Sequence, residues 1–283
     1  MHTPFRPLTT PIEPGRMRRP LVADADPRES RHGSALGRFE AAAASACGRL
    51  HDSNEDAHSP PGGPGRLFVV ADGVGGGAMA QLASRDLVGL LHDALAQGRI
   101  DAERVRTAVL DADRTIARRI ARQTDRPGAA TLALCARLDV FASRWLVAWV
   151  GDCRVYRHGG HDGAALELLT RDDTFGELAE TPPAGGSLDD PARMVGNGAV
   201  ARPSAASYTL APGAFLVLCS DGLHKHLGAD EWTRVLARPA VPLARRCDEL
   251  VARARANGSS DDATVLMLRR QTAGEQADAG GAP

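Results

Sequence analysis

Short apolar runs with polar ends dominate the hydrophobic pattern and predict β-strands. Six such runs are rich in aliphatic and β-branched residues: Leu67–Ala71, Thr131–Leu138, Trp145–Val150, Arg154–Arg157, Phe215–Cys219 and Thr264–Leu268. Residues from Arg38 onward are also strand-like. Several runs are apolar on both faces, so we expect central strands in sheets that are covered on both sides.

Four longer segments have apolar residues at helical spacing: Ala80–Leu95, Asp101–Gln123, Ala229–Leu236 and Leu243–Ala256. The last one begins after Pro242 and ends at Asn257-Gly258, which suits a helix C-terminus. The helices come in consecutive pairs between groups of strands. This order predicts an α+β fold with sheets covered by helix pairs, rather than alternating βα units.

The two ends of the chain lack such periodicity. The first 30 of the 283 residues contain six prolines, and the last 13 are Gly, Ala and polar residues. We therefore expect a flexible arm at residues 1–36, one domain at 37–270 and a flexible tail at 271–283. The domain is long enough for one sizeable core. The Gly/Pro/Asp-rich segment Thr174–Asn197 is expected to be a surface loop.

Charge and composition exclude several classes of protein. The formal net charge is −1, which gives no electrostatic footprint for nucleic acid or an anionic membrane. No apolar run approaches the length of a membrane span, and no signal peptide is legible. The five cysteines are widely spaced, which favours reduced thiols and a cytoplasmic location. We expect a monomer.

Acidic residues stand at the ends of the apolar runs. The sequence places Glu55 and Asp56 after the first strand-like stretch, and Asp72, Asp152 and Asp221 at the ends of three predicted strands. Asp261-Asp262 directly precedes another strand. A single Asp-Gly pair is commonly only a turn, but five clusters at strand ends are harder to explain that way.

Converged carboxylates would repel one another and raise each other's pKa values, which divalent cations would relieve. Ligands made only of oxygen favour Mg²⁺ or Mn²⁺ over Zn²⁺. The glycines at 73–77 could instead cradle a phosphate. However, the segment lacks the lysine of a P-loop and does not fit a dinucleotide fingerprint, so nucleotide binding is the weaker hypothesis.

Six segments in order resemble the motifs of the PP2C (PPM) family of metal-dependent protein serine/threonine phosphatases, in its compact bacterial form. They are NEDA at 54–57, VADGVGG at 70–76, GDCRVYR at 151–157, LTRDDT at 169–174, LCSDGL at 218–223 and SDDATVL at 260–266. The resemblance covers roughly residues 38–270. It implies a four-layer α-β-β-α sandwich and hydrolysis of phosphoserine or phosphothreonine without a phosphoenzyme.

The resemblance also implies roles for single residues. Asp72 would bridge two Mg²⁺ or Mn²⁺ ions, and Asp221 and Asp261 would complete one site. Glu55 and the Gly73 carbonyl would complete the other, while Asp56 would accept a hydrogen bond and orient the attacking water.

Two departures from the family pattern change what we expect. His51 stands where the family has an arginine that binds substrate phosphate, and an imidazole cannot copy that bidentate fork. Arg49 is the alternative phosphate ligand; in an extended strand it would face the same side as His51. Lys225, the single lysine of the chain, replaces an acid that helps hold a third metal near Asp152. We expect Lys225 to pair with Asp152 and to leave two metals rather than three.

Two hypotheses for the function follow. The first is an active protein phosphatase that opposes a bacterial Ser/Thr kinase, with control of type VI secretion as one setting for it. The second is a weakly active or inactive scaffold that binds metal and a kinase or phosphoprotein, because the phosphate-binding and third-metal positions have changed.

Overall fold

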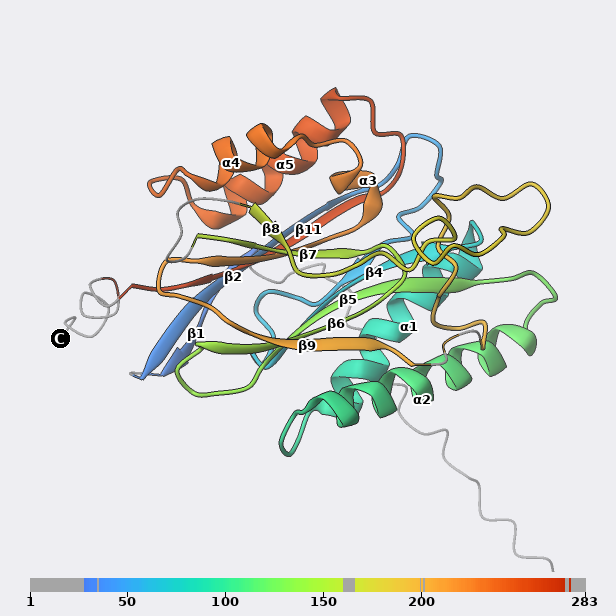
Figure 1. Ribbon diagram of the computed structural model, residues 1–283, viewed down its shortest axis with the longest axis horizontal. Coiled ribbons are helices and arrows are strands. Elements are labelled where there is room, and N and C mark those ends of the chain that lie inside the picture. The colour runs from blue at the N-terminus through green and yellow to red at the C-terminus, as the bar shows by residue number, and fades with distance from the viewer. Residues whose placement is uncertain are drawn as a thin grey trace, which may run out of the picture.

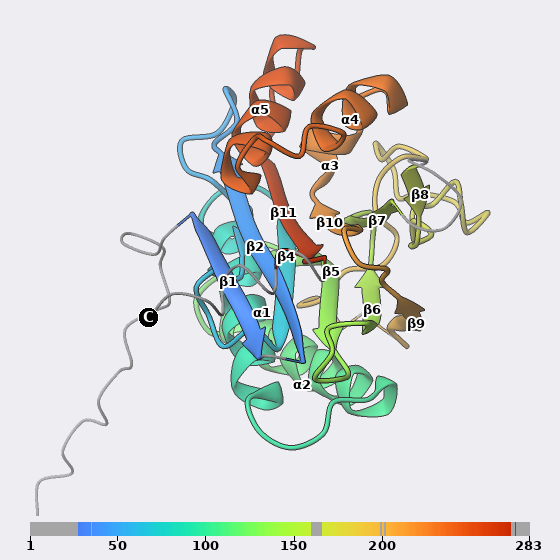
Figure 2. The ribbon, with the colours of Figure 1, turned by 90° about the vertical axis from the view of Figure 1, so that its left-hand side faces the viewer.

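Two antiparallel β-sheets stacked face to face, with helices outside each, make up the chain (Figure 1). The computed structural model describes residues 28–34, 36–159, 166–198, 200, 202–272 and 275. The four-layer α-β-β-α sandwich expected from the sequence is confirmed. In Figure 2 the helix pairs lie at opposite ends of the stack and the sheets lie between them.

The first sheet has six strands in the order β1-β2-β11-β10-β7-β8. Their bounds are β1 Glu29–Ser34, β2 Gly37–Ala46, β11 Ala263–Arg270, β10 Phe215–Cys219, β7 Arg154–His158 and β8 Leu166–Leu168. The second sheet has five strands in the order β3-β4-β5-β6-β9. Their bounds are β3 Ala57–His58, β4 Leu67–Val74, β5 Ala129–Arg137, β6 Arg144–Val150 and β9 Ser204–Thr209.

In the described part of the chain, five helices complete the fold: α1 Ala78–Leu95, α2 Ala102–Ala121, α3 Asp221–His224, α4 Ala229–Leu236 and α5 Leu243–Ala256. Helices α1 and α2 cover the second sheet, and α4 and α5 cover the first. Three apolar layers result, one under each helix pair and one between the sheets. Within the described residues, no helix is both long and apolar enough to cross a membrane.

The expected domain limits need correction at both ends. Residues Glu29–Ser34, expected in the flexible arm, form β1, which pairs with β2 along its whole length. The sequence of β1 is polar, so its hydrogen bonds to β2 rather than an apolar pattern explain its place in the sheet. At the other end, Gln271 is buried and its backbone N–H donates to Arg38 O at 2.9 Å. Residues 1–27 lie outside the described part of the chain.

Strand ends from both sheets meet at one edge of the sandwich. The chain leaves β2 through residues 47–56, and Gly151 and Asp152 follow β6 directly. Ser220 and Asp221 follow β10, and Asp262 precedes β11. At Gly222, an added Cβ would collide with Asp262 O, so the Asp-Gly pair serves close packing as well as turning. Four of the five acidic clusters expected from the sequence therefore lie at this edge, while Asp72, expected at a strand end, lies inside β4 near its end.

Candidate metal centre

Asp72 lies at the middle of the acidic edge. Burial raises the pKa of Asp72 well above its ordinary value, and the charges of Asp56, Asp221, Asp152 and Asp261 raise it further. Such an effect requires these four carboxylates to be near Asp72 in space. The structure therefore brings together the acids that the sequence placed at separate strand ends.

Asp56 is held in this group by residues at the ends of β10 and β11. Its Oδ2 accepts a hydrogen bond from Ser220 Oγ at 2.7 Å, and Ser220 Oγ accepts one from Thr264 N at 3.0 Å. Burial raises the pKa of Asp56 to about 8, despite hydrogen bonds from Thr264 and Ser220 that lower it. Sequence reasoning missed Ser220; its position beside Asp221 was the available signal.

Glu55 connects the acidic edge to the start of α1. Its Oε1 accepts a hydrogen bond from Gly77 N at 2.5 Å, and its backbone carbonyl accepts one from Ser84 Oγ at 2.5 Å. A carboxylate is favourable at this helix N-terminus because unpaired N–H groups point towards it. A Cβ on Gly73 would come within 2.8 Å of Glu55 O. Gly73 and Glu55, the expected ligands of one ion, are thus neighbours.

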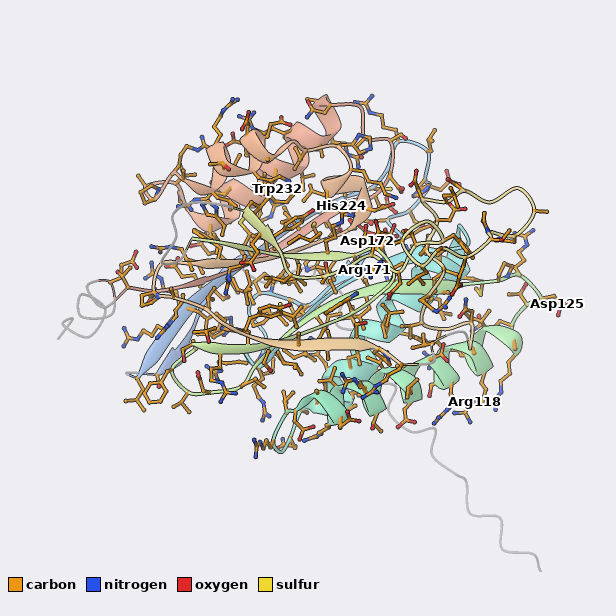
Figure 3. All side chains as sticks on the ribbon, viewed as in Figure 1. Arg118, Asp125, Arg171, Asp172, His224 and Trp232 are labelled. Carbon is orange, nitrogen blue, oxygen red and sulfur yellow. The ribbon has the colours of Figure 1, made fainter. Side chains whose placement is uncertain are left out.

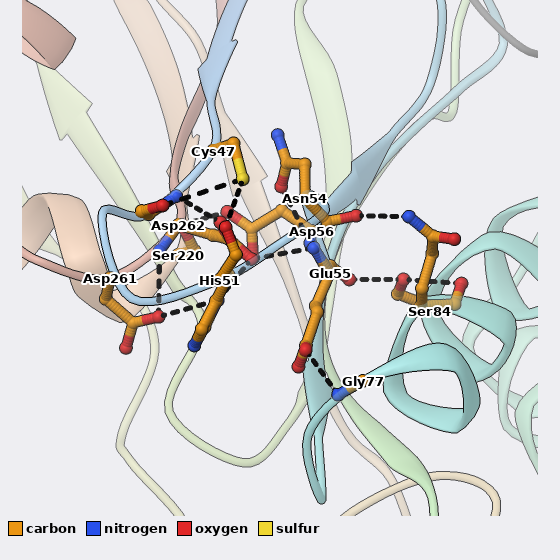
Figure 4. A network of polar contacts seen from close by, with 12 residues as sticks. Cys47, His51, Asn54, Glu55, Asp56, Gly77, Ser84, Ser220, Asp261 and Asp262 are labelled. Carbon is orange, nitrogen blue, oxygen red and sulfur yellow. Dashed lines mark hydrogen bonds and ion pairs between the residues drawn. The ribbon is translucent and has the colours of Figure 1, made fainter.

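Asp262 fixes the loop that follows β2 (Figure 4). Its Oδ1 accepts from Gly48 N at 2.5 Å, and its Oδ2 accepts from Glu55 N at 2.7 Å. His51 Nδ1 lies 3.0 Å from Asp262 Oδ2 and 3.8 Å from Asp261 Oδ1. The hydrogen bond to Asp262 raises the pKa of His51, against a smaller lowering by burial. His51 is therefore fixed at the edge of the acidic cluster, where its contact with Asp262 favours the cationic form of the ring.

The expectation of an extended strand at Arg49 is wrong. Residues 48–51 form a turn, in which His51 N donates to Gly48 O at 3.4 Å. Arg49 lies in the turn and is exposed, and its backbone N–H donates to Ser260 O at 2.9 Å. The side chains of Arg49 and His51 therefore do not share one face of a strand. The sequence signal for this turn was the polar run after Cys47.

Lys225 contacts Asp152, as expected, and also Asp221. Its Nζ lies 3.3 Å from Asp152 Oδ2 and 2.7 Å from Asp221 Oδ2. Burial and the charge of Asp221 raise the pKa of Asp152 to about 7, although Lys225 lowers it. Burial alone would raise the pKa of Asp221, but the charge of Lys225 and its hydrogen bond lower it. The contact with Asp221 was not expected.

Further polar contacts lie near Asp152, and one of them involves its backbone carbonyl. Arg154 pairs with Asp172 through Nη2 at 2.7 Å, and His224 Nε2 lies 3.0 Å from Asp152 O. Burial lowers the pKa of His224 to about 4, so it remains neutral. Figure 3 marks His224 and Asp172 in this region. Cys153 beside them is buried, and burial raises the pKa of its thiol, which agrees with a structural rather than a catalytic thiol.

The donor set fits divalent cations that prefer oxygen ligands. Asp56 Oδ1 and Asp221 Oδ1 are buried without a hydrogen-bond partner in the described structure, a costly arrangement unless a cation or water satisfies them. Ligand atoms of His51, Asp261 and Asp262 also lie within 4.8 Å of one another. Because Asp262 already accepts two backbone hydrogen bonds, we assign Asp262 to positioning the loop, while Asp261 remains an expected metal ligand and His51 an expected phosphate ligand.

Comparison with known proteins identifies the family. The model for stage II sporulation protein E (SpoIIE) matches residues 63–271, most of the chain, which therefore belongs to this family. Together with the fold and the ordered motifs, this confirms the expected PPM class of phosphatases.

Individual proteins that are similar to this chain support the same family. Serine/threonine phosphatase stp of Listeria monocytogenes is 26% identical over 229 residues, covering 75% of this chain and 88% of that protein. PppA, described as a key regulatory component of T6SS in Pseudomonas aeruginosa, is 27% identical with a TM-score of 0.70, covering 82% of this chain and 97% of that one. The PstP catalytic domain in complex with 2 manganese ions is 25% identical with a TM-score of 0.69, covering 83% and 99%.

Proposed function

We propose that the chain hydrolyses phosphoserine and phosphothreonine in proteins, using two Mg²⁺ or Mn²⁺ ions. The observation that carries this proposal is the convergence of Asp56, Asp152, Asp221 and Asp261 on the partly buried Asp72. Buried carboxylates at this density require a positive charge. The serine/threonine phosphatase from Listeria and the manganese-bound PstP domain support both the activity and the cations.

The ligand roles are those that the resemblance to the phosphatase family implies for these positions. Asp72 would contact both ions, Asp221 and Asp261 would hold one, and Glu55 with the Gly73 carbonyl would hold the other. Cations in such a site lower the pKa of water and neutralise phosphoryl oxygens. Asp56, fixed by Ser220, would accept a hydrogen bond from the attacking water and set its direction.

Substrate phosphate would be bound outside the carboxylates by His51 and Arg49. The hydrogen bond to Asp262 favours the cationic form of His51, and the exposed Arg49 adds a second positive charge. A charged imidazole donates one hydrogen bond through its remaining nitrogen, whereas an arginine donates two in parallel. We therefore expect weak phosphate binding and a high KM.

The wider context is also proposed. PppA is a regulator of type VI secretion, which supports a role of this chain in the same kind of pathway, opposite a Ser/Thr kinase. The near-neutral charge favours a protein substrate over nucleic acid. The chain would act in the cytoplasm as a monomer, without a membrane partner.

The decisive experiment compares the chain with its Asp72→Asn variant in Mn²⁺-dependent hydrolysis of p-nitrophenyl phosphate and of a phosphothreonine peptide. We expect the variant to retain less than about a hundredth of the activity, because the shared ligand loses its charge. Asp125→Asn, at an exposed position after α2, is the matched control and should leave activity unchanged. Activity of Asp72→Asn near that of the control would contradict the assignment.

The same assay tests the scaffold hypothesis. A chain that binds Mn²⁺ and a phosphoprotein but hydrolyses neither substrate would be an inactive member of the family. The changed phosphate-binding position at His51 is the observation that keeps this alternative open.

A further inference from the structure

Lys225 contributes a cation to the acidic centre from within the protein. It follows the last residue of α3 and lies one turn after Asp221, with which it forms an i,i+4 pair. Its side chain is 40% exposed, but those of its partners are only 3% exposed for Asp152 and 19% for Asp221. Asp152 comes from a distant strand end, so the ammonium joins two elements of the centre.

The carboxylate oxygens are divided between Lys225 and the rest of the centre. Lys225 Nζ contacts Oδ2 of Asp221 and Oδ2 of Asp152. Asp221 Oδ1 is buried and has no hydrogen-bond partner in the described residues. The ammonium thus occupies one oxygen of Asp221 and leaves the other available as a single ligand atom.

An ordinary i,i+4 pair on a helix surface would not have these properties. Exposed pairs of that kind stabilise proteins little and leave both charges in water. Here a nearly buried carboxylate, Asp152, depends on the same ammonium. Among the described residues, Lys225 is the group that forms ion pairs with Asp152 and Asp221. Its loss would leave the buried Asp152 and the partly buried Asp221 without compensation.

We propose that Lys225 is a positioning residue that occupies the place of a metal ion between Asp152 and Asp221. The ammonium fixes Asp221 so that Oδ1 alone is offered to a cation, and it limits the centre to two divalent ions. The inference rests on the proposed metal centre. The Lys225 ammonium is then a permanent cation of the centre, and it neutralises part of the acidic cluster before any metal binds.

The first test compares the thermal stability of Lys225→Met in excess chelator and in Mn²⁺. Methionine keeps much of the side-chain length and removes the charge. We expect the Tm of the metal-free variant to fall by roughly 3–6 °C, since uncompensated carboxylates destabilise the folded state. With Mn²⁺ present, most of that loss should be recovered, because a metal ion can then neutralise the same acids.

Arg157→Met is the matched control. Arg157 forms an ion pair with Glu167 on β8, and its side chain is 32% exposed. Its metal-free and metal-loaded Tm values should fall by equal, small amounts. Equal falls for Lys225→Met in both conditions would show a merely structural role for Lys225 and overturn the proposal, as would no fall at all.

The second test counts bound ions by isothermal titration with MnCl₂ and by native mass spectrometry. We expect two Mn²⁺ ions per chain and three in Lys225→Asp, whose new carboxylate replaces the resident cation by a ligand. Two ions in both proteins would overturn the proposal. Failure here is separate from failure of the proposed function, because p-nitrophenyl phosphate hydrolysis by the unaltered chain reports on that function alone.

Discussion

The carboxylate of Asp262 makes three contacts at the candidate site. Its two carboxylate oxygens accept from Gly48 N and Glu55 N and also bind His51 Nδ1. One side chain at the start of β11 thereby holds both ends of a loop that carries an expected metal ligand and the phosphate-binding histidine. An amide has only one oxygen, so an asparagine cannot reproduce this pattern.

We therefore expect Asp262→Asn to destabilise the chain by about 1–3 kcal/mol, because at least one buried N–H loses its acceptor. Thermal or urea unfolding measures this loss. Asp125→Asn, which is exposed, is the control and should change stability by less than about 0.5 kcal/mol. If Asp262→Asn proves as stable as this control, the loop is held by other contacts.

His51→Arg should lower KM for p-nitrophenyl phosphate. A guanidinium can bind phosphate with two charge-assisted hydrogen bonds, each worth about 1.5–3 kcal/mol, so the gain could reach tenfold or more. Steady-state kinetics at saturating Mn²⁺ measure it. Arg49→Gln is the companion variant. An unchanged KM in His51→Arg together with a raised KM in Arg49→Gln would assign phosphate binding to Arg49 instead.

At the scale of elements, the apolar runs predicted the central structure well. The predicted segments Phe215–Cys219, Ala229–Leu236 and Leu243–Ala256 match β10, α4 and α5. The side chains that these elements bury are the apolar residues that recur periodically in the sequence. The prediction failed for β1 and β9, which have mostly polar or small residues and lie at sheet edges. Pairing with a neighbouring strand, rather than local preference, makes these segments β-structure.

In the candidate site, too, some features could be predicted from the sequence and others could not. The acids at strand ends were predictable because each stands next to an apolar run, and the motif resemblance assigned their roles. The hydrogen bonds from Ser220 to Asp56 and from Gly48 to Asp262 were not predictable, because each joins residues more than 160 positions apart. The turn at 48–51 was also missed, since no proline and only one glycine marks it.

Asp113 connects a helix to the surface loop that follows β8. It lies buried on α2, and its Oδ1 accepts from Gly196 N at 2.6 Å and from Gly198 N at 3.1 Å. Asp113→Ala should therefore loosen this loop and destabilise the chain by about 1–3 kcal/mol. Limited proteolysis should detect faster cleavage between residues 174 and 198. Asp111→Ala, on the exposed side of the same helix, should leave the cleavage rate unchanged.

For the molecule as a whole, the layered fold is what brings so many acids together. Two sheets and their helix pairs bury three apolar layers, and the strand ends between these layers hold the carboxylates. Burial of these apolar layers stabilises the fold enough to outweigh the repulsion among the carboxylates. The carboxylates therefore still repel one another in the folded, metal-free state. A dependence of stability on pH and on metal is the expected consequence.

Metal-free protein should lose stability as the pH rises from 6.5 to 8.5. The pKa values of Asp56 and Asp152 are raised from 3.8 to about 8 and about 7, mainly by burial, so the folded chain binds protons that the unfolded chain has released. This extra proton binding stabilises the folded state at low pH. The stabilisation is lost as the pH rises through the pKa values of the folded state. His51, whose pKa is raised by Asp262, acts in the same direction.

The buried histidines change the stability mainly below pH 6.5, outside the range from 6.5 to 8.5. Burial lowers the pKa of His58 and His224, so their neutral folded forms gain stability as the pH rises towards 6.5, below that range. Between pH 6.5 and 8.5, the free energy of unfolding should fall by about 2 kcal/mol, which lowers the Tm by roughly 4–8 °C. Differential scanning fluorimetry in chelator and in saturating Mn²⁺ measures it. The metal-loaded profile should be flatter, because cations replace protons as the neutralising charge, and Asp56→Asn should flatten the metal-free profile. A metal-free Tm that stays level or rises between pH 6.5 and 8.5 would show that the carboxylates are already ionised and compensated without metal.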